Sequence, residues 1–347
     1  MKLKKLLSLT LAVLLCACGV AAFSSCGQSA YNIPIVCGEA GMNNACGVAT
    51  YGVDYYSLGL KAGDMAADIL LDGKDISTMP VQTDPNPALS VSNTVVEEIG
   101  FTVPQSVLDK ATASGVEKVT PTDAIVESDA DFTVGILQQT QHVALDQANE
   151  GFRDQLSVRM KAASKTVKFD NQNASGELAN NVTIAEQFVA QNVDLIYAIA
   201  TPSAQAAAAA TAEAKEIPVL FNAVTNPVEA ELVADMNAPG GNVSGVSDIN
   251  PVEDQVDLIA ELLGKTDIKI GFLYTSAESN SVYQVGLGVE HCKAKGYEYV
   301  EEGIGDINDI QSAFIALKAA GVDAIYIPTD NVLANGAANI HSLNIGE

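Results

Sequence analysis

The feature that most constrains the fold is a regular alternation of short apolar runs with amphipathic or alanine-rich segments. From Phe132 to Val224, runs of strand length such as "FTVGILQQT" and "VDLIYAIATP" alternate with segments of helical length such as "ALDQANEGFRDQLSV". The strand-like runs are too continuously apolar to leave one face in water, so they predict a parallel sheet covered by helices on both faces. The pattern therefore predicts the α/β class.

A second series of the same kind follows. The segment 238–248, "APGGNVSGVSD", interrupts the rhythm with proline and glycine, and a helix is expected to begin at Pro251. Strands and helices then alternate to the end of the chain, which is long enough at 347 residues for two units with cores of their own. We expect two series of β-α units with right-handed crossovers.

The two ends of the chain look like halves of one unit. The stretch 322–347, "VDAIYIPTDNVLANGAANIHSLNIGE", reads as a strand, a polar turn and a helix, and then stops. The related stretch at 193–224 continues with "KEIPVLFNAV", and its counterpart is "YNIPIVCGEA" at Tyr31. We therefore expect Tyr31 and Glu347 to lie close together in space.

The first 26 residues have the form of a secretory signal: Lys2, Lys4 and Lys5 precede an apolar run, and small residues and cysteines follow. They resemble a bacterial lipoprotein signal, in which a cysteine is lipidated. Cys26 and Cys18 both fit, and Cys26 is favoured by the polar sequel "GQSA". A plain cleaved signal is the alternative.

Three cysteines follow the signal, and none has zinc spacing. Cys37 and Cys46 could form a disulfide in an oxidising compartment, although two small buried thiols are the preferred reading. Cys292 stands alone.

The composition also excludes several functions. With a formal charge of −25, the chain is a poor candidate for nucleic acid or anionic membrane surfaces. No nucleophile elbow or P-loop occurs, and "GLGVEH" lacks the third glycine of a dinucleotide fingerprint. We expect no catalytic site, no cofactor and no metal.

Several segments together resemble the solute-binding proteins of bacterial ABC importers, of the type assigned to tryptophan, tyrosine and related amino acids. The resemblance rests on "VGILQQTQHVALDQANEGF", "IYAIATPSAQAA", "VLFNAVTNPVEAELV", "GNVSGVSD", "GFLYTSAESNS", "IYIPTDN" and "ATYGVDYYSLGLKAGDMAADIL". It implies a type I periplasmic-binding-protein fold, with two Rossmann-like lobes that are joined by hinge strands and close on a solute. It also implies a circular permutation, because family members carry the "YGVDYYSLG" type segment at the end and this chain carries it near the start.

The resemblance also implies how the segments are divided between the lobes. Residues 27–54 are expected in lobe 2 with strands leading to a hinge, and 55–76 as a helix of lobe 1. Residues 77–105 should return to lobe 2, and the polar, acidic stretch 106–131 reads as a linker. Lobe 1 then comprises 132–247, and lobe 2 is completed by 248–347.

Ligands of such sheets bind at the carboxyl ends of the strands, where this sequence places polar turns. Thr201 and Ser203 stand at the start of an alanine-rich helix, where free backbone N–H groups could bind the carboxylate of a ligand. Alternatively, these two residues only cap the helix. The sequence has only two arginines, Arg153 and Arg159, and both lie away from the strand ends. We therefore do not expect an arginine to bind the ligand carboxylate. Asp330 is the first choice for a ligand ammonium, or it is an N-cap, with Asp248 and Glu39 as further choices.

Other residues at strand ends complete the predicted site. Phe221 and Tyr274 are the candidates for an aromatic platform in a chain without tryptophan, and Phe221 fits a core position better. The further candidates are Gln139, Thr140, His142, Asn226, Glu278, Asn280, Ser281, Thr329 and Asn331.

The leading hypothesis is an exported, membrane-anchored lipoprotein, monomeric, that binds an aromatic or hydrophobic L-amino acid and delivers it to ABC permease subunits. The alternatives are a sugar or nucleoside receptor of the same fold and a sensor that docks on a membrane signalling protein. Both use the same hinge closure, so the sequence does not separate import from sensing.

Overall fold

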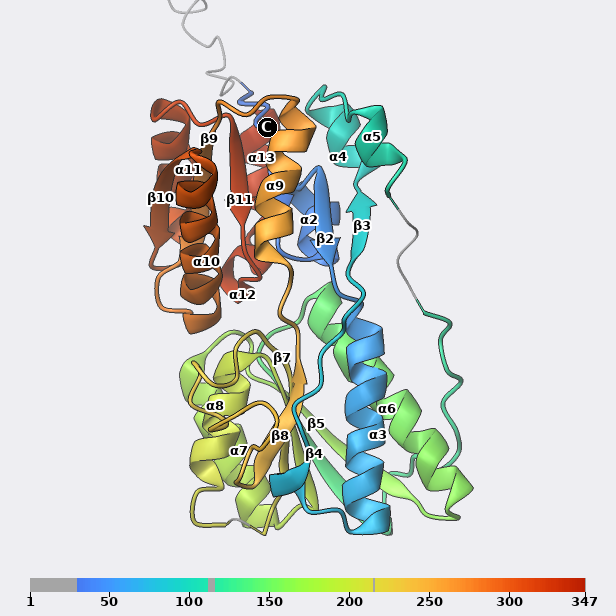
Figure 1. The fold of residues 1–347 in the computed structure, drawn as a ribbon. Coiled ribbons are helices and arrows are strands. Elements are labelled where there is room, and N and C mark those ends of the chain that lie inside the picture. Colours follow the sequence, from blue (N-terminus) through green and yellow to red (C-terminus); the bar gives the residue numbers. More distant parts are fainter. Residues whose placement is uncertain (1–29, 112–115, 215, 347) are drawn as a thin grey trace, which may run out of the picture.

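The structure is a computed structural model that describes residues 30–111, 116–214 and 216–346. These residues form two α/β lobes, each built on one sheet, stacked along the long axis of the molecule (Figure 1). The α/β class and the two parallel-stranded sheets are therefore confirmed. The predicted signal at 1–26, with Cys18 and Cys26, lies outside the described residues, as does Glu347.

Lobe 1 contains a five-stranded parallel sheet in the order β5-β4-β6-β7-β8. Its strands are β4 (Phe132–Gln138), β5 (Val167–Asn173), β6 (Leu195–Ile199), β7 (Val219–Val224) and β8 (Val243–Ser247). The crossover helices are α6 (Val143–Ala162), α7 (Leu178–Gln191) and α8 (Thr201–Ala210). The central strands β6 and β7 are buried along their whole length, as their apolar sequences predict.

Lobe 2 contains a six-stranded sheet in the order β10-β9-β11-β1-β2-β3. Its strands are β1 (Ile35–Cys37), β2 (Ala49–Gly52), β3 (Ala88–Val91), β9 (Lys269–Thr275), β10 (Glu298–Ile304) and β11 (Ala324–Ile327). Its helices are α2 (Ala40–Cys46), α4 (Asn93–Glu98), α5 (Gln105–Leu108), α9 (Val252–Leu263), α10 (Ser279–Lys295), α11 (Ile310–Ala319), α12 (Asn331–Asn335) and α13 (Ala337–Ile345). All pairs are parallel except β2 with β3, which is antiparallel at the sheet edge.

Helix α3 (Tyr55–Asp72) leaves lobe 2 and packs beside α6 on lobe 1 (Figure 1). Two glycines allow the helices to approach closely. A Cβ on Gly59 would lie 2.3 Å from the carbonyl oxygen of Ala148, and a Cβ on Gly151 would lie 2.2 Å from that of Tyr56. The α3–α6 seam is therefore closed to larger side chains at these positions.

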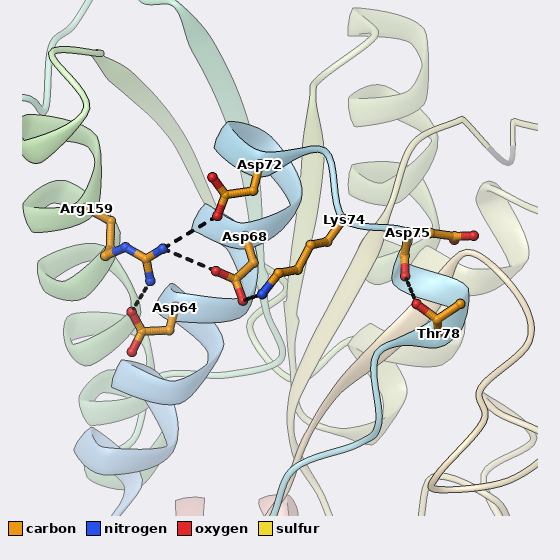
Figure 2. A network of polar contacts seen from close by, with 7 residues as sticks. All are labelled: Asp64, Asp68, Asp72, Lys74, Asp75, Thr78 and Arg159. Atoms are coloured by element: carbon orange, nitrogen blue, oxygen red, sulfur yellow. Dashed lines mark hydrogen bonds and ion pairs between the residues drawn. The ribbon is translucent and has the colours of Figure 1, made fainter.

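An ion-pair network fixes the far end of this seam (Figure 2). Asp64, Asp68 and Asp72 follow one another at four-residue spacing, which places them on one face of α3. Arg159 of α6 donates to Asp64 at 2.7 Å and to Asp68 at 3.1 Å, and Lys74 also donates to Asp68, at 2.6 Å. One of the two arginines is thus committed to holding two helices together.

The two ends of the described chain meet in lobe 2. Strand β1 lies between β11 and β2, and Ile35 pairs with Ile325. The Tyr31 N–H donates to the carbonyl of Asn344 at 2.8 Å. The side chain of Asn344 accepts from the Ile33 N–H at 2.9 Å and donates to the Ile33 carbonyl at 2.8 Å. The N-terminal strand therefore completes the sheet that the C-terminal helix covers.

Some elements differ from the sequence-based expectation. The segment 238–248 was read as an interruption, but it contains β8, in which Gly245 adopts a φ of 159° that brings it against Phe221. Helix α2 was not predicted, and the last helix breaks at Gly336 into α12 and α13. The strand periodicity of residues 243–247 was hidden by two small residues, Ser244 and Gly245.

The connecting segments are also more structured than expected. Residues 77–105 do not leave lobe 1 at once, because the Val81 and Gln82 N–H groups donate to lobe 1 carbonyls before β3 begins. The expected linker 106–131 starts inside α5, where Val107 is buried in the lobe 2 core. At its other end Ala124 is buried in lobe 1, and the Val126 N–H donates to the Val167 carbonyl. Buried apolar residues in a polar stretch anchor both ends.

Cys37 and Cys46 are buried thiols with their sulfur atoms 3.9 Å apart, and Cys292 is buried as well. Burial raises the pKa of the Cys37 thiol well above its usual value. Within the ranges that the structure describes, no helix is both long and apolar enough to span a membrane.

Candidate binding cleft

The candidate site is a cleft between the lobes, at the carboxyl ends of strands from both sheets. Lobe 1 contributes residues that follow β4, β7 and β8, and lobe 2 contributes residues that follow β1, β9 and β11. The lining residues are Glu39, Met42, Tyr55, His142, Leu145, Ala223, Thr225, Asp248, Asn280, Thr329, Asp330, Asn331 and Ala334. This is the location expected for ligands of doubly wound sheets.

Seven of the predicted residues line this cleft. They come from five different loops, and the fold brings them together although they are spread over almost 300 positions of sequence. They are Glu39, His142, Asp248, Asn280, Thr329, Asp330 and Asn331.

Three further predicted residues stand directly behind or beside the lining. The Ser281 hydroxyl donates to Asp330 at 2.7 Å, and Glu278 accepts from the Asn331 N–H at 3.0 Å. On the other lobe, Thr140 accepts a hydrogen bond from Asn335 at 3.1 Å. The first two orient lining residues, and the third links the lobes.

The other predicted residues point elsewhere. Gln139 and Ser203 both bond to the buried Asn181 of α7, so they hold α7 against the sheet. Thr201 is buried at the start of α8, and Asn226 accepts from the N–H groups of its own turn. Tyr274 packs against the lobe 2 core. None of these five lines the cleft, although the sequence pattern predicts all of them there.

Of the two candidates for an aromatic platform, Phe221 is fully buried in the core of lobe 1, as its apolar strand indicates. The aromatic residue that does reach the cleft is Tyr55, the first residue of α3.

Six lining residues were missed: Met42, Tyr55, Leu145, Ala223, Thr225 and Ala334. Met42 belongs to the unpredicted α2, so no pattern pointed to it. Tyr55 and Thr225 carry a detectable signal, because each is a hydroxyl-bearing residue next to an element end. The apolar members supply a hydrophobic part of the cleft.

Asp330 has no unused hydrogen-bonding capacity. Its carboxylate accepts from the Thr275 N–H and hydroxyl, the Ser281 hydroxyl and the Leu333 N–H, at 2.7 to 2.9 Å. A carboxylate has about four acceptor positions, so these four donors fill them. Asp330 therefore caps α12 and fastens it to β9.

Glu39 and Asp248 are less saturated. Glu39 caps α2 by accepting from the Gly41 and Met42 N–H groups. Asp248 accepts from the Tyr55 hydroxyl at 2.6 Å and the Thr225 hydroxyl at 3.2 Å. Each carboxylate accepts two hydrogen bonds and has capacity for about two more.

Repulsion between carboxylates contributes to two raised pKa values at the cleft. Burial, followed by repulsion from Asp330, raises the pKa of Glu278 to about 7. Burial is also the main cause of the raised pKa of Asp248, with a smaller contribution from Glu39. No lysine or arginine is among the residues that line the cleft. An added positive charge would therefore be strongly stabilised here.

His142 does not supply that charge. Burial lowers its pKa, and Nδ1 accepts from the Ala144 N–H at 3.2 Å as the cap of α6. A neutral ring with an accepting nitrogen matches this contact, whereas a protonated ring would lose it.

The hinge lies beside the cleft. The chain crosses between the lobes at 52–54, 83–87 and 248–251. Asn250 accepts from the Val53 N–H at 3.1 Å, and Tyr55 binds Asp248, so two crossings are joined by residues next to the cleft. A ligand that contacts Asp248 is thus in direct contact with the hinge.

The lobes are nearly closed in this structure. The hydroxyls of Thr225 and Thr329, from opposite lobes, are 3.4 Å apart, and Thr140 bonds to Asn335. The cleft encloses a cavity of about 20 Å³, room for about one water molecule. A solute of amino-acid size requires the lobes to separate by rotation about the hinge.

Among the described residues, no group of three or more histidine, cysteine or carboxylate side chains is arranged to hold a metal ion. The cleft offers carboxylates, hydroxyls, amides and an apolar wall, which suit reversible binding of a small molecule.

Comparison with known proteins gives a consistent result. The model of the family "ABC transporter substrate binding protein" matches residues 15–114 and 133–345. A "Tyrosine-binding protein" of Clostridioides difficile is 41% identical over 202 residues, which are 58% of this chain and 57% of that protein. The chain thus aligns with little more than half the length of this curated relative.

Two solved structures are similar in both sequence and fold. One is an ABC domain from Streptococcus pneumoniae in complex with L-Trp, with 37% identity and a TM-score of 0.53, covering 62% of this chain and 71% of that one. The other is a conserved domain protein from Vibrio cholerae, with 38% identity and a TM-score of 0.54, covering 61% and 72%. With its two lobes, its interlobe cleft and a family match over most of its length, the chain belongs to the ABC transporter substrate-binding protein family.

Proposed function

We propose that this protein captures an aromatic or hydrophobic L-amino acid between its lobes and delivers it to an ABC importer. The observation that carries the proposal is the charge of the cleft. Glu39, Asp248 and Asp330 line it, Glu278 stands behind them, and no cationic side chain is among the lining residues. A ligand ammonium group supplies the missing positive charge.

We assign the ammonium to Glu39 and Asp248, in place of Asp330, which the sequence favoured. Asp330 already accepts four hydrogen bonds, whereas Glu39 and Asp248 retain acceptor capacity. Because Asp248 also touches Tyr55 and the hinge, binding there favours the closed arrangement. The Thr329 hydroxyl, which accepts from Gln284 and keeps its own proton, is the donor proposed for the ligand carboxylate.

The apolar wall supports a hydrophobic side chain on the ligand. Met42, Leu145, Ala223 and Ala334 line the cleft together with the Tyr55 ring. The related protein named for tyrosine and the related domain solved with L-Trp support the same ligand class.

A matched set of ligands tests the charge argument. We expect L-tyrosine or L-tryptophan to bind in isothermal titration, and L-tyrosine amide, which keeps the ammonium, to retain binding. N-acetyl-L-tyrosine, which lacks the positive charge, should bind at least ~10-fold more weakly, as expected for loss of a charge-assisted hydrogen bond. Equal affinity for the acetylated compound would refute the ammonium assignment.

Variants test the residues. Asp248→Asn and Glu39→Gln should each weaken L-tyrosine binding by ~10-fold or more, because each removes one negative charge next to the ammonium. Glu301→Gln, on the exposed face of β10, is the matched control and should bind normally. Binding of a sugar or nucleoside, with none of any amino acid, would support the alternative receptor of the same fold.

We further propose that the chain is exported and held at the extracytoplasmic face by a lipid on Cys26 or Cys18, and that it acts as a monomer. The support is the signal-like sequence and the family. Labelling of growing cells with a palmitate analogue, compared between Cys26→Ser and Cys18→Ser, tests the anchor. Delivery to permease subunits, as opposed to sensing, is tested by solute uptake in cells with and without the protein.

We propose, finally, that the chain is a circular permutation of the family order, with lobe boundaries near 54, 76, 105, 131 and 247. The meeting of β1 with β11 and α13 supports this, as does a family match in two segments that leaves out 115–132. A variant that joins residue 346 to residue 31 and opens the chain at 115–131 should fold and bind the same ligand. Failure of that variant to fold would count against the permutation.

A further inference from the structure

A second pocket, outside the cleft, lies at the open edge of the lobe 1 sheet between β5 and α6. It has a volume of about 310 Å³, within the ~300–1,000 Å³ range of small-ligand sites. Six amide side chains, two carboxylates and one arginine line it: Gln138, Gln141, Asp146, Asn149, Glu150, Arg153, Asn171, Gln172 and Asn173. We call it the amide pocket. It shares no lining residue with the cleft.

Arg153 is positioned in this pocket but makes no ion pair with the described residues. Its guanidinium lies over the ring of Phe169, 5.5 Å from the centroid, and its Nε is buried without a hydrogen-bond partner. Of the two carboxylates in the lining, Glu150 binds Lys118, and Asp146 accepts from Gln138 at 2.7 Å. Because Arg153 forms an ion pair with neither of them, its guanidinium remains available to the carboxylate of a ligand.

Asn149 provides a second unsatisfied group. It is only 7% exposed, and its Nδ2 donates to Gln138 at 2.9 Å and to Asn171 at 3.1 Å. Its Oδ1 is buried with no donor in the described residues. A buried acceptor without a partner costs stability, so a shift of the Asn149 side chain that lets a donor group of a ligand reach Oδ1 would be favoured.

The contact between α6 and β5 is polar only at this pocket. Further along α6, Phe152, Leu156 and Met160 are fully buried apolar residues of the lobe 1 core. Asn149 and Arg153, one turn apart, instead face Asn171 and Phe169 of β5. Polar residues at a helix–sheet contact, where the same helix otherwise supplies apolar ones, break the usual pattern of a core, and such departures occur at functional or strained sites.

We propose that the amide pocket binds a hydroxylated carboxylate of monosaccharide size, such as a uronic acid. Arg153 holds the carboxylate, because a guanidinium presents paired N–H donors that match its two oxygens. The amides and Asn149 Oδ1 bind the hydroxyl groups, since each amide offers both donors and an acceptor. This site is separate from the amino-acid cleft and does not depend on the function proposed for it.

The test is titration of the full chain with D-glucuronate and D-galacturonate, followed by NMR or calorimetry. We expect saturable binding of at least one of them, and at least ~10-fold weaker binding of D-glucose, which lacks the carboxylate, and of acetate, which lacks the hydroxyls. No saturation by either uronate up to about 10 mM would overturn the proposal.

Two arginine variants give a matched comparison. Arg153→Met should weaken uronate binding by at least ~10-fold, and Arg153→Lys should restore part of it. Arg159→Met, on the same helix but paired with Asp64 and Asp68, should leave uronate binding unchanged. L-Tyrosine added to saturation should not displace the uronate. Displacement, or equal uronate binding by Arg153→Met and wild type, would place the uronate elsewhere and refute the site.

Discussion

Replacing Asn344 by alanine should destabilise the protein markedly, because one side chain joins the first strand to the last helix. Asn344 is fully buried and Ile33 is 4% exposed. The variant leaves the N–H and the carbonyl of Ile33 without their side-chain partner in a buried position. At ~1–3 kcal/mol for each unsatisfied group, partly offset by the better helix propensity of alanine, we expect a loss of about 2–4 kcal/mol.

The assay is urea unfolding followed by circular dichroism, with hydrogen exchange at the Ile33 amide as a local probe. The midpoint should fall without a change in m, and the Ile33 amide should lose protection. Asn339→Ala, at an exposed position of the same helix, is the control and should stay within about 0.5 kcal/mol of wild type. If Asn344→Ala were equally neutral, the side-chain bridge would contribute nothing and the reasoning would be wrong.

Three further predictions follow from the site and the seam. Affinity for L-tyrosine should decrease as the pH falls below about 7, because Glu278 takes up a proton there, and Glu278→Gln should flatten that dependence in calorimetry. Because the pKa of Glu278 is raised in the folded state, the ligand-free protein should become more stable in thermal denaturation as the pH is lowered from about 7 towards 4.5. The Glu278→Gln variant should lack this gain, and a larger gain in the variant than in wild type would contradict the raised pKa. Arg159→Met should cost about 1–2 kcal/mol in urea unfolding, a modest value because its partners are part-exposed, and a Lys74→Met control should cost less than about 1 kcal/mol.

The fold was largely predictable because its signal is periodic. The uniformly apolar strands β6 and β7 could only belong to a covered parallel sheet, and the repeat predicted that β1 pairs with the last unit of the chain. Helix α2 could not be predicted because its seven residues, "AGMNNAC", show no amphipathic period. Strand β8 could not be predicted because Ser244 and Gly245 are as common in turns as they are compatible with a strand.

The site was predictable only to the level of which loops form it. Strand-end residues such as Asp248 and Asp330 were found because strand ends are visible in sequence. Whether a carboxylate oxygen is free to bind a ligand depends on the hydrogen bonds it already accepts. The four donors around Asp330 belong to Thr275, Ser281 and Leu333, and no local sequence pattern indicates that these residues contact Asp330. The sequence could not place Ser203 for the same reason, since only the structure shows it bonded to Asn181 and outside the cleft lining.

The meeting of β1 with α13 also determines when lobe 2 can fold. Ile33 and Asn344 are 311 positions apart, so this contact cannot form until the segment that contains residue 344 is available. Lobe 1 has its five strands within 132–247 and can form earlier, whereas β1, β2 and β3 stay without their sheet. Such long-range pairing slows folding and exposes strand edges in the meantime. The nascent N-terminal segment is therefore where a chaperone would be needed most.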